Sequence, residues 1–244
     1  MTTYTLFISD LHLSENHPLT AELLFQFLNK EARTAEALYI LGDFFEMWVG
    51  DDDKSAFHEK IKTALRAVTQ AGMPIYFMHG NLDFLIGKHF AKETGMTLLK
   101  EPTIINLYGE RILLLHGDSL CTLDVKHQKS RKIMHNRFYQ KMVLWFVPLS
   151  IRRHYGNRFR SGSIERKSYL PDNIMDVSQE AVEEAMEAAG VKTLIHGHTH
   201  RPAIHETKLN RRIVLGAWHE SGVYCRADSN GPQIRLLESQ LDQK

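Results

Sequence analysis

Short apolar runs alternate with amphipathic stretches over the first hundred residues, and this alternation restricts the fold more than any other feature of the sequence. Apolar runs at 4–9, 37–41 and 75–78 have the length of strands. The stretches between them, 19–30 and 55–71, carry apolar residues at the spacing of an amphipathic helix. Strands that alternate with helices predict an α/β layered fold.

A different pattern interrupts the chain after Cys121. From 124 to 160 helix formers run almost unbroken around an apolar block at 142–149, and Gly162 and Pro171 follow in a polar stretch. The α/β pattern continues on both sides, with a predicted hairpin at 104–115, a helix at 178–189 and strands at 191–195, 205–215 and 222–237. We therefore predict a single domain over 1–244 with a helical insertion at about 121–175.

Charge is unevenly distributed along the chain. The net charge is only +1, which argues against a protein that binds nucleic acid over a uniformly basic surface. Between 125 and 167, however, twelve Lys and Arg residues stand against one acid, whereas 43–53 holds five acids and no base. This asymmetry predicts one segment that faces anions and another that faces cations.

Export and a membrane span are not expected from the sequence. The first residues lack the basic and long apolar regions of a signal peptide. No stretch approaches the ~20 apolar residues that cross a bilayer. Cys121 and Cys225 cannot form a disulfide framework, so a reducing, cytoplasmic location is predicted.

Side chains of the kinds that bind metals follow the ends of five predicted strands. Asp or Asn beside glycine after a strand usually marks a turn. Five such ends in register with the strand pattern are hard to explain by turns alone. The side chains are Asp10, His12, Asp43, Asn81, His116, His198 and His200. Open α/β sheets bind ligands outside the carboxyl ends of their strands, so these groups are predicted to meet.

These side chains offer carboxylate, amide and imidazole groups and no thiolate. Such a mixed oxygen and nitrogen set suits Mn²⁺, Fe or Zn²⁺ rather than a structural zinc site. Seven ligands are more than one tetrahedral ion needs, but they suit two octahedral ions that share a bridging carboxylate. Two ions roughly 3.5–4 Å apart are the arrangement that catalyses in-line phosphoryl displacement.

The motif HGHTH at 196–200 follows an apolar run and places histidines at alternate positions. In an extended backbone, alternate side chains point the same way. We therefore predict that His196, His198 and His200 converge on one point, where they meet metal. A histidine packed in the core or lying on the surface is the simpler alternative for any one of them.

Together, the motifs D-x-H, GD, GN, HG and GHTH resemble those of the calcineurin-like metallophosphoesterases. The longer strings FISDLHLS, LYILGDFFEMWVGDDD, MHGNLDFLIG, HGDSLC and LIHGHTHRPAIHE resemble the branch of that superfamily that hydrolyses UDP-2,3-diacylglucosamine in lipid A biosynthesis. The resemblance covers nearly the whole chain. It implies a sandwich of two mixed β-sheets flanked by helices, with the helical insertion as a lid.

The resemblance also implies roles for individual residues. It assigns one Mn²⁺ to Asp10, His12, Asp43 and His200, and a second Mn²⁺ to Asp43 as the bridge, Asn81, His116 and His198. The catalytic set that it implies is Asp10, His12, Asp43, Asn81 and His116. His196 would then either hold these ligands in position or have a purely structural role.

Substrate contacts implied by the resemblance fall on Asn81, Leu82, Asp124, Ser163, Lys167, Leu170 and His198. Three of these positions depart from the family's usual residues. Leu82 stands where arginine is common, which removes a guanidinium suited to phosphate oxygens. Lys167 and Leu170 stand where asparagine and lysine are usual. Substrate recognition is therefore predicted to be partly rearranged beside an unchanged metal site.

The activity that the resemblance implies is hydrolysis of a pyrophosphate bond by water activated between two Mn²⁺ ions. The products would be UMP and 2,3-diacylglucosamine 1-phosphate. The apolar block at 142–149, set among basic residues, predicts a lid that encloses acyl chains and touches the cytoplasmic face of the inner membrane. The alternative is a helical hairpin that buries this block in the main core. A monomer is expected.

Two other functions are compatible with the same fold. One is a two-metal phosphodiesterase that acts on nucleotides or phosphoproteins, and it would have no use for an acyl-binding insertion. The other is a non-catalytic, membrane-associated scaffold, which would be expected to have lost metal ligands. All seven predicted ligands are present in this chain.

Overall fold

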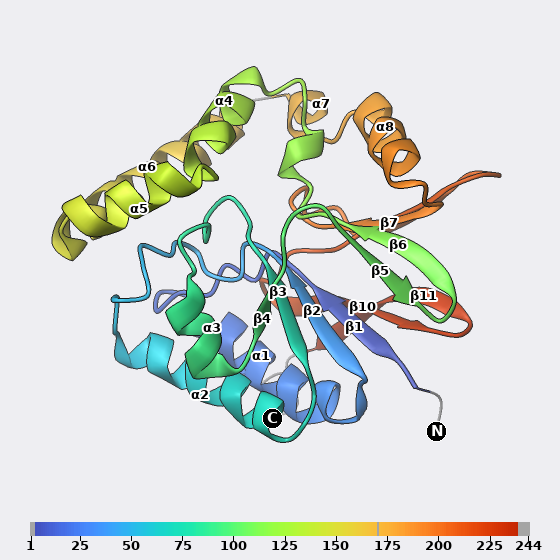
Figure 1. The fold of residues 1–244 in the computed structure, drawn as a ribbon, viewed down its shortest axis with the longest axis horizontal. Coiled ribbons are helices and arrows are strands. Elements are labelled where there is room, and N and C mark those ends of the chain that lie inside the picture. The colour runs from blue at the N-terminus through green and yellow to red at the C-terminus, as the bar shows by residue number, and fades with distance from the viewer. Residues whose placement is uncertain (1–2, 170, 239–244) are drawn as a thin grey trace.

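The computed structural model describes residues 3–169 and 171–238, apart from the side chains of 163, 164, 166–168, 172 and 173 (Figure 1). The chain folds into two mixed β-sheets packed face to face, with helices on the outer face of each sheet. This arrangement confirms the predicted α/β sandwich.

The first sheet has the strand order β11-β10-β1-β2-β3-β4. The strands from β1 to β4 run parallel, and β10 pairs antiparallel with both β1 and β11. The bounds are β1 (Thr5–Ile8), β2 (Ala37–Leu41), β3 (Ile75–Met78), β4 (Thr97–Leu98), β10 (Ser221–Asp228) and β11 (Gly231–Glu238).

The second sheet has the strand order β5-β6-β7-β9-β8. Its three central strands run parallel, and β5 and β8 form antiparallel edges. The bounds are β5 (Thr103–Leu107), β6 (Glu110–Leu114), β7 (Thr193–His196), β8 (Ala203–Glu206) and β9 (Arg211–Val214).

Apolar side chains from both sheets meet in the space between them. Phe7, Leu41 and Met78 of the first sheet pack with Ile112 and Ile195 of the second. Both β1 and β7 are buried along their whole length because each is covered on two faces. Strands of this kind consist of continuous apolar residues, which is why short apolar runs predicted them.

Helices cover the outer faces of the two sheets, with α1 to α3 on the first and α8 on the second (Figure 1). Serine residues begin two of these helices by capping them. Ser55 accepts a hydrogen bond from the His58 backbone N–H, and Ser178 accepts one from Ala181. The bounds are α1 (Pro18–Lys30), the 3₁₀ helix η1 (Ala32–Thr34), α2 (Ala56–Gln70), α3 (Lys88–Thr94) and α8 (Gln179–Ala189).

The described residues of the insertion form four helices, and the first three begin within 124–160, where the sequence predicted one nearly continuous run. Asn136 begins a new helix by accepting hydrogen bonds from two backbone N–H groups. Pro148 forces another break, because it disfavours a helical backbone at Val147, which is extended. The bounds are the 3₁₀ helix η2 (Asp118–Leu120), which precedes the insertion helices, then α4 (Val125–Met134), α5 (Arg137–Phe146), α6 (Leu149–Tyr169) and α7 (Asp172–Met175).

Ion pairs join α6 to the acidic segment 43–53. Arg152 pairs with Asp52, Arg153 pairs with Asp53, and Arg160 pairs with Glu46. Part of the positive charge of the insertion therefore pairs with the acidic segment of the same chain. These pairs hold the insertion over the loop that follows β2.

Candidate metal centre

The loops that follow β1, β2, β3, β6 and β7 meet at one edge of the sandwich. Their side chains form two groups whose ligand atoms lie within 4.8 Å of one another in each group. One group is Asp10, His12 and His200, and the other is Asp43, His116 and His198. The strand ends therefore bring six of the seven predicted ligands together, and Asn81 joins the second group by a contact described below.

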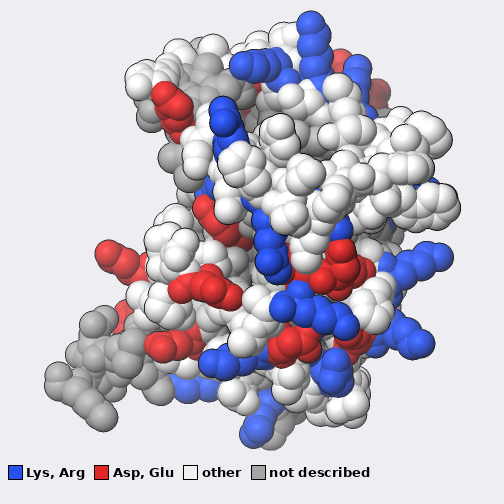
Figure 2. All heavy atoms as spheres, turned by 90° about the vertical axis from the view of Figure 1, so that its left-hand side faces the viewer, with Lys and Arg blue, Asp and Glu red and all other residues white. Residues whose placement is uncertain are grey.

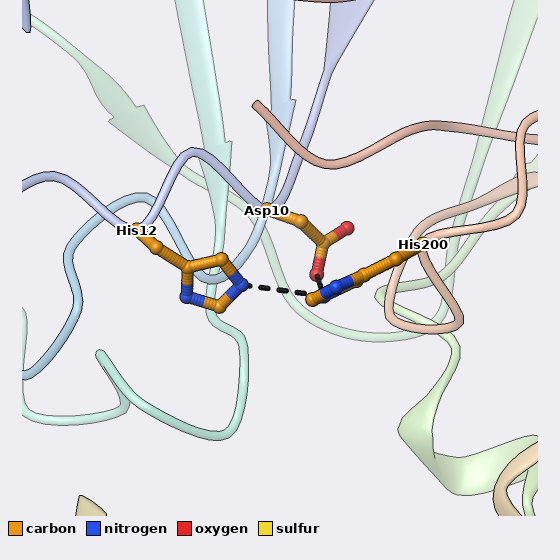
Figure 3. Close-up of side chains that lie close together, drawn as sticks. All are labelled: Asp10, His12 and His200. Atoms are coloured by element: carbon orange, nitrogen blue, oxygen red, sulfur yellow. Dashed lines mark hydrogen bonds and ion pairs between the residues drawn. The ribbon is translucent and has the colours of Figure 1, made fainter. Parts of the chain in front are cut away.

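Asp10, His12 and His200 turn toward one another in the first group (Figure 3). His200 Nε2 lies 3.2 Å from Asp10 Oδ1 and 3.2 Å from His12 Nε2. A proton between two imidazole nitrogens can be held by only one of them, whereas a cation would accept a lone pair from each. The donors in this group therefore fit a metal ion.

His116 is the centre of the second group. Its Nε2 lies 3.3 Å from Asn81 Oδ1 and 3.8 Å from Asp43 Oδ1. Its Nδ1 lies 2.8 Å from the Leu41 carbonyl oxygen, which can only accept, so the proton of the neutral ring stays on Nδ1. Once the ring is neutral, its Nε2 lone pair faces Asp43 and Asn81, as in metal-binding histidines whose other nitrogen is hydrogen-bonded.

Left-handed backbone angles aim most of these side chains. Six non-glycine residues within the described part of the chain have positive φ, and five of them are predicted metal ligands. These five are Asp10 (φ 56°), His12 (50°), Asp43 (50°), His198 (69°) and His200 (58°). Such angles cost roughly 1–3 kcal/mol at a non-glycine residue and persist where surrounding structure imposes them. The fold thus maintains strain at the residues that form the two groups.

Two glycines let backbone approach the carboxylates. A Cβ atom on Gly80 would lie 2.2 Å from Asp43 Oδ1, and one on Gly197 would lie 2.4 Å from Asp10 Oδ2. Both distances are far below van der Waals contact. Glycine is therefore required beside each of the two carboxylates for this geometry.

His196 does not join the other histidines of HGHTH, so the prediction that all three converge is wrong. The strand β7 ends at His196, and left-handed angles at His198 and His200 direct their rings into different groups. His196 is fully buried, its Nδ1 donates to the Gly197 carbonyl, and Arg212 contacts its Nε2. Burial lowers the pKa of His196 to about 4, so the ring is neutral.

A buried ionic network, which the sequence patterns did not indicate, ties α4 to the second group. Arg131 pairs with both Asp118 and Glu101, and Glu101 accepts a hydrogen bond of 2.8 Å from the His116 backbone N–H. His127 Nε2 lies 3.3 Å from Asp118 Oδ2, and its ring packs 5.5 Å from that of His198. The only sequence signal was Asp118 in the HGD motif, because its partners lie on distant segments.

Replacing Arg131 with Gln is expected to lower the free energy of unfolding by about 3 kcal/mol, because two buried carboxylates would lose their cation. Arg131→Lys keeps the charge and should lose less. Urea denaturation of the three proteins would measure these differences. Arg137→Gln removes an exposed arginine as a control, and an Arg131→Gln protein as stable as that control would contradict the role of the network.

Metal binding is expected to release protons at pH 7. Burial alone would lower the pKa of His116, but the carboxylates of Asp43, Asp118 and Asp10 raise it to about 9 in the metal-free protein. The ring is therefore protonated below that pH and must lose a proton to bind metal, so affinity should rise as pH approaches 9. Calorimetry of Mn²⁺ binding in buffers of different ionisation enthalpy would count the protons. A pH-independent affinity between pH 6 and 9 would contradict this expectation.

The residues predicted to contact substrate are only partly described. Leu82 is 1% exposed, and its backbone N–H donates to Asp43 Oδ1 at 2.9 Å. Asp124 is buried and caps α4 by accepting from the His127 N–H. The side chains of Ser163 and Lys167, and the whole of Leu170, lie outside the described residues. The substrate contacts of all five residues stay predictions.

Two packed sheets with paired carboxylate and imidazole groups at their shared edge define a class of metal-dependent phosphoesterase. The chain belongs to the calcineurin-like phosphoesterase family, whose model matches residues 3–202. Its two groups of ligands form a candidate dinuclear metal site.

Two curated relatives are similar to this chain over nearly their whole length. The chain is 50% identical over 234 residues to the UDP-2,3-diacylglucosamine hydrolase of Escherichia coli strain K12, covering 94% of this chain and 97% of the relative. It is 47% identical, with the same coverage, to the UDP-2,3-diacylglucosamine hydrolase of Serratia proteamaculans. A solved structure of Vps29 from Entamoeba histolytica complexed with Zn²⁺ is similar at 13% identity and a TM-score of 0.48, covering 96% of this chain and 98% of that one.

Proposed function

We propose that the protein hydrolyses the pyrophosphate bond of UDP-2,3-diacylglucosamine to UMP and 2,3-diacylglucosamine 1-phosphate, with two Mn²⁺ ions held by the candidate metal centre. The names of the curated relatives, at 47–50% identity, support this substrate. An apolar cavity formed between the insertion and the loops of the metal centre is the observation that carries the proposal.

This cavity has a volume of about 450 Å³ and is lined mostly by apolar side chains. One wall consists of Met47, Trp48 and Val49, which follow Asp43 in the chain, together with Phe84 and Leu85, which follow Asn81. The other wall comes from the insertion helices, with Val143, Val147, Ile151, Tyr155 and Phe159 among its residues.

Two of the four loops that carry ligands of the second group, those of Asp43 and Asn81, thus continue into the cavity wall. A backbone hydrogen bond of 3.0 Å from Trp48 N–H to the Leu82 carbonyl joins the two loops. A substrate whose phosphates lie at the metal centre can therefore place attached acyl chains in the cavity. A nucleotide or phosphoprotein substrate offers nothing to fill such a space, which disfavours the alternative phosphodiesterase.

The mixed donor set suits Mn²⁺, because it combines carboxylate, amide and imidazole without thiolate. When bound, two such ions would polarise the phosphoryl oxygens and lower the pKa of a bound water. The chain's own residues orient the ligands. The Glu46 carboxylate lies 3.4 Å from His12 Nδ1, whereas His12 Nε2 faces His200, so Nε2 is the nitrogen placed to bind the metal. Ser9 and the His198 backbone N–H donate to Asp10 Oδ2, which leaves Oδ1 for the metal.

We further propose that the insertion touches the cytoplasmic face of the inner membrane. Its exposed aromatic side chains include Phe138 (73%), Trp145 (82%) and Phe146 (68%). The face of the molecule that carries the far ends of α5 and α6 has a broad uncharged area bordered by Lys and Arg (Figure 2). Within 3–169 and 171–238 no helix has both the length and the hydropathy to cross a bilayer. The exposure of Trp145 and Phe146 argues against the alternative that these two side chains are buried in the main core.

Replacing Trp145 and Phe146 together with Ser is expected to weaken binding to vesicles of bacterial lipids by roughly tenfold, because two large apolar side chains no longer enter the interface. The KM for a long-acyl substrate should rise, and metal content should not change. Leu209→Ser removes an exposed apolar side chain elsewhere and serves as the control. Vesicle binding equal to that of the control would contradict the membrane contact.

Product analysis tests the proposed reaction. The metal-loaded protein is incubated with UDP-2,3-diacylglucosamine, and the products are separated and identified by mass. UMP and 2,3-diacylglucosamine 1-phosphate are expected in equal amounts, and chelation of the metal should stop their formation. An intact substrate after prolonged incubation with Mn²⁺ would contradict the proposal and favour the scaffold alternative. Monomeric state stays a prediction that light scattering would test.

A further inference from the structure

A second groove lies between α3, the segment that follows it and the junction of α4 and α5. Its volume is about 880 Å³, within the range of roughly 300–1,000 Å³ found for small-molecule sites. None of the seven predicted metal ligands lines it. The groove is therefore separate from both the metal centre and the apolar cavity, although Glu101 and Arg131 of the buried network form part of its wall.

Cations from four segments surround this groove. Lys88 and Lys92 lie one turn apart on α3, Lys100 precedes β5, and Arg137 begins α5. Arg131 of α4 also lines the groove, but its charge is already engaged in ion pairs with Asp118 and Glu101. The only carboxylate in the wall is Glu101, and Arg131 already neutralises it. The groove thus carries a strong excess of positive charge.

The cations on the rim of the groove are available to a ligand. Among the described residues, no side-chain hydrogen bond or ion pair engages Lys88, Lys92, Lys100 or Arg137. This contrasts with Arg152, Arg153 and Arg160 of α6, which pair with the acidic segment 43–53. His135 also lines the groove, and its Nε2 is buried without a hydrogen-bond partner in the described part of the chain. The rim therefore offers positive charge that no described acidic side chain pairs with, while the buried His135 Nε2 is not accessible from the groove.

We infer that this groove binds a ligand that carries phosphate, at a site separate from the metal centre. Ammonium and guanidinium groups that converge from several segments match the oxygens of a phosphate group. The volume of the groove favours a headgroup or a small phosphorylated molecule over the flat face of a protein partner. Phe138, exposed beside Arg137 at the rim, would meet the apolar part of an anionic lipid whose headgroup entered the groove. This inference does not depend on the proposed substrate.

Binding measurements on the metal-loaded full chain test the inference and distinguish the two sources of phosphate. One arm uses sedimentation with phosphatidylcholine vesicles, with and without phosphatidylglycerol. The other uses calorimetry with UMP and with inorganic phosphate. Phosphate that binds to the metals contributes equally in every variant, because none of the substitutions touches the metal centre.

The groove variant replaces Lys88, Lys92 and Lys100 with Gln, which removes charge but preserves helix propensity. The control variant makes the same change at Lys30, Lys60 and Lys192, three exposed lysines that do not line the groove. Thermal unfolding of both variants checks that each is folded. An Arg137→Gln protein provides a second groove variant with a single substitution outside α3.

We expect the groove variant to bind one of the probes at least roughly tenfold more weakly than the control, with a smaller loss for Arg137→Gln. A loss confined to vesicles that contain phosphatidylglycerol identifies a lipid headgroup as the ligand. A loss confined to UMP or inorganic phosphate identifies a soluble phosphate. Equal binding of every probe by the groove and control variants would overturn the inference.

Discussion

Replacing Asp43 with Ala is expected to lower kcat/KM by roughly a thousandfold or more, a loss of about 4 kcal/mol of transition-state stabilisation. Asp43 Oδ1 lies 3.8 Å from His116 Nε2 and 2.9 Å from the Leu82 backbone nitrogen. The Asp43 carboxylate is proposed to bind both ions as a bridge. Removal of this carboxylate should therefore also lower the metal content of the protein.

Steady-state kinetics and elemental analysis of the purified variant, after chelation and reloading with Mn²⁺, measure both effects. Asp228→Ala, at the end of β10, removes a carboxylate that belongs to neither group of ligands, and its activity and metal content should equal those of the unchanged protein. An Asp43→Ala protein that retains two ions per chain would show that this carboxylate does not bridge them.

Adding one methyl group beside Asp43, by Gly80→Ala, is expected to have nearly as large an effect. The new Cβ would lie 2.2 Å from Asp43 Oδ1 and 2.3 Å from the Asp43 backbone nitrogen, so the backbone itself must shift. We expect activity to fall roughly a hundredfold, because a displacement of about 1 Å at a reacting centre has effects of that size. Mn²⁺ binding should weaken in parallel.

Gly162→Ala supplies the matched control for this substitution. A Cβ on Gly162 would meet nothing within 4 Å, and alanine in a helix is favoured over glycine by roughly 0.5–1 kcal/mol. Its metal binding should be unchanged. If Gly80→Ala bound Mn²⁺ as tightly as Gly162→Ala in calorimetry, the close approach of Gly80 to Asp43 would not be essential.

Periodicity predicted the strands and helices of an α/β layered fold because these elements obey simple rules of burial, whereas the sandwich of two sheets was implied by the family resemblance. β1, β2 and β3 are short apolar runs, and α1 and α2 present one apolar face to the first sheet. The short elements α3 and β4 carry no comparable pattern, and they were not predicted. The division of the insertion into separate helices depends on Asn136 and Pro148, whose effect a count of helix-forming residues does not include.

The ligands of the candidate metal centre were predicted by their position after strands, but their geometry was not. Histidine is enriched among the few non-glycine residues with left-handed angles, but this preference does not say which histidines adopt them, and the angles at His198 and His200 depend on the surrounding fold. For this reason the assumption of an extended HGHTH failed at His196. The network of Glu101, Asp118 and Arg131 was missed for a similar reason, since only the folded chain brings these residues together.

The most direct test of the account compares two substrates that differ in their acyl chains. We would measure kcat/KM for UDP-2,3-diacylglucosamine and for UDP-N-acetylglucosamine with Mn²⁺, before and after chelation. Burial of acyl chains in the apolar cavity predicts a preference of roughly a hundredfold or more for the diacylated substrate, and loss of both activities without metal. Equal values for the two substrates, or hydrolysis that survives chelation, would contradict the account.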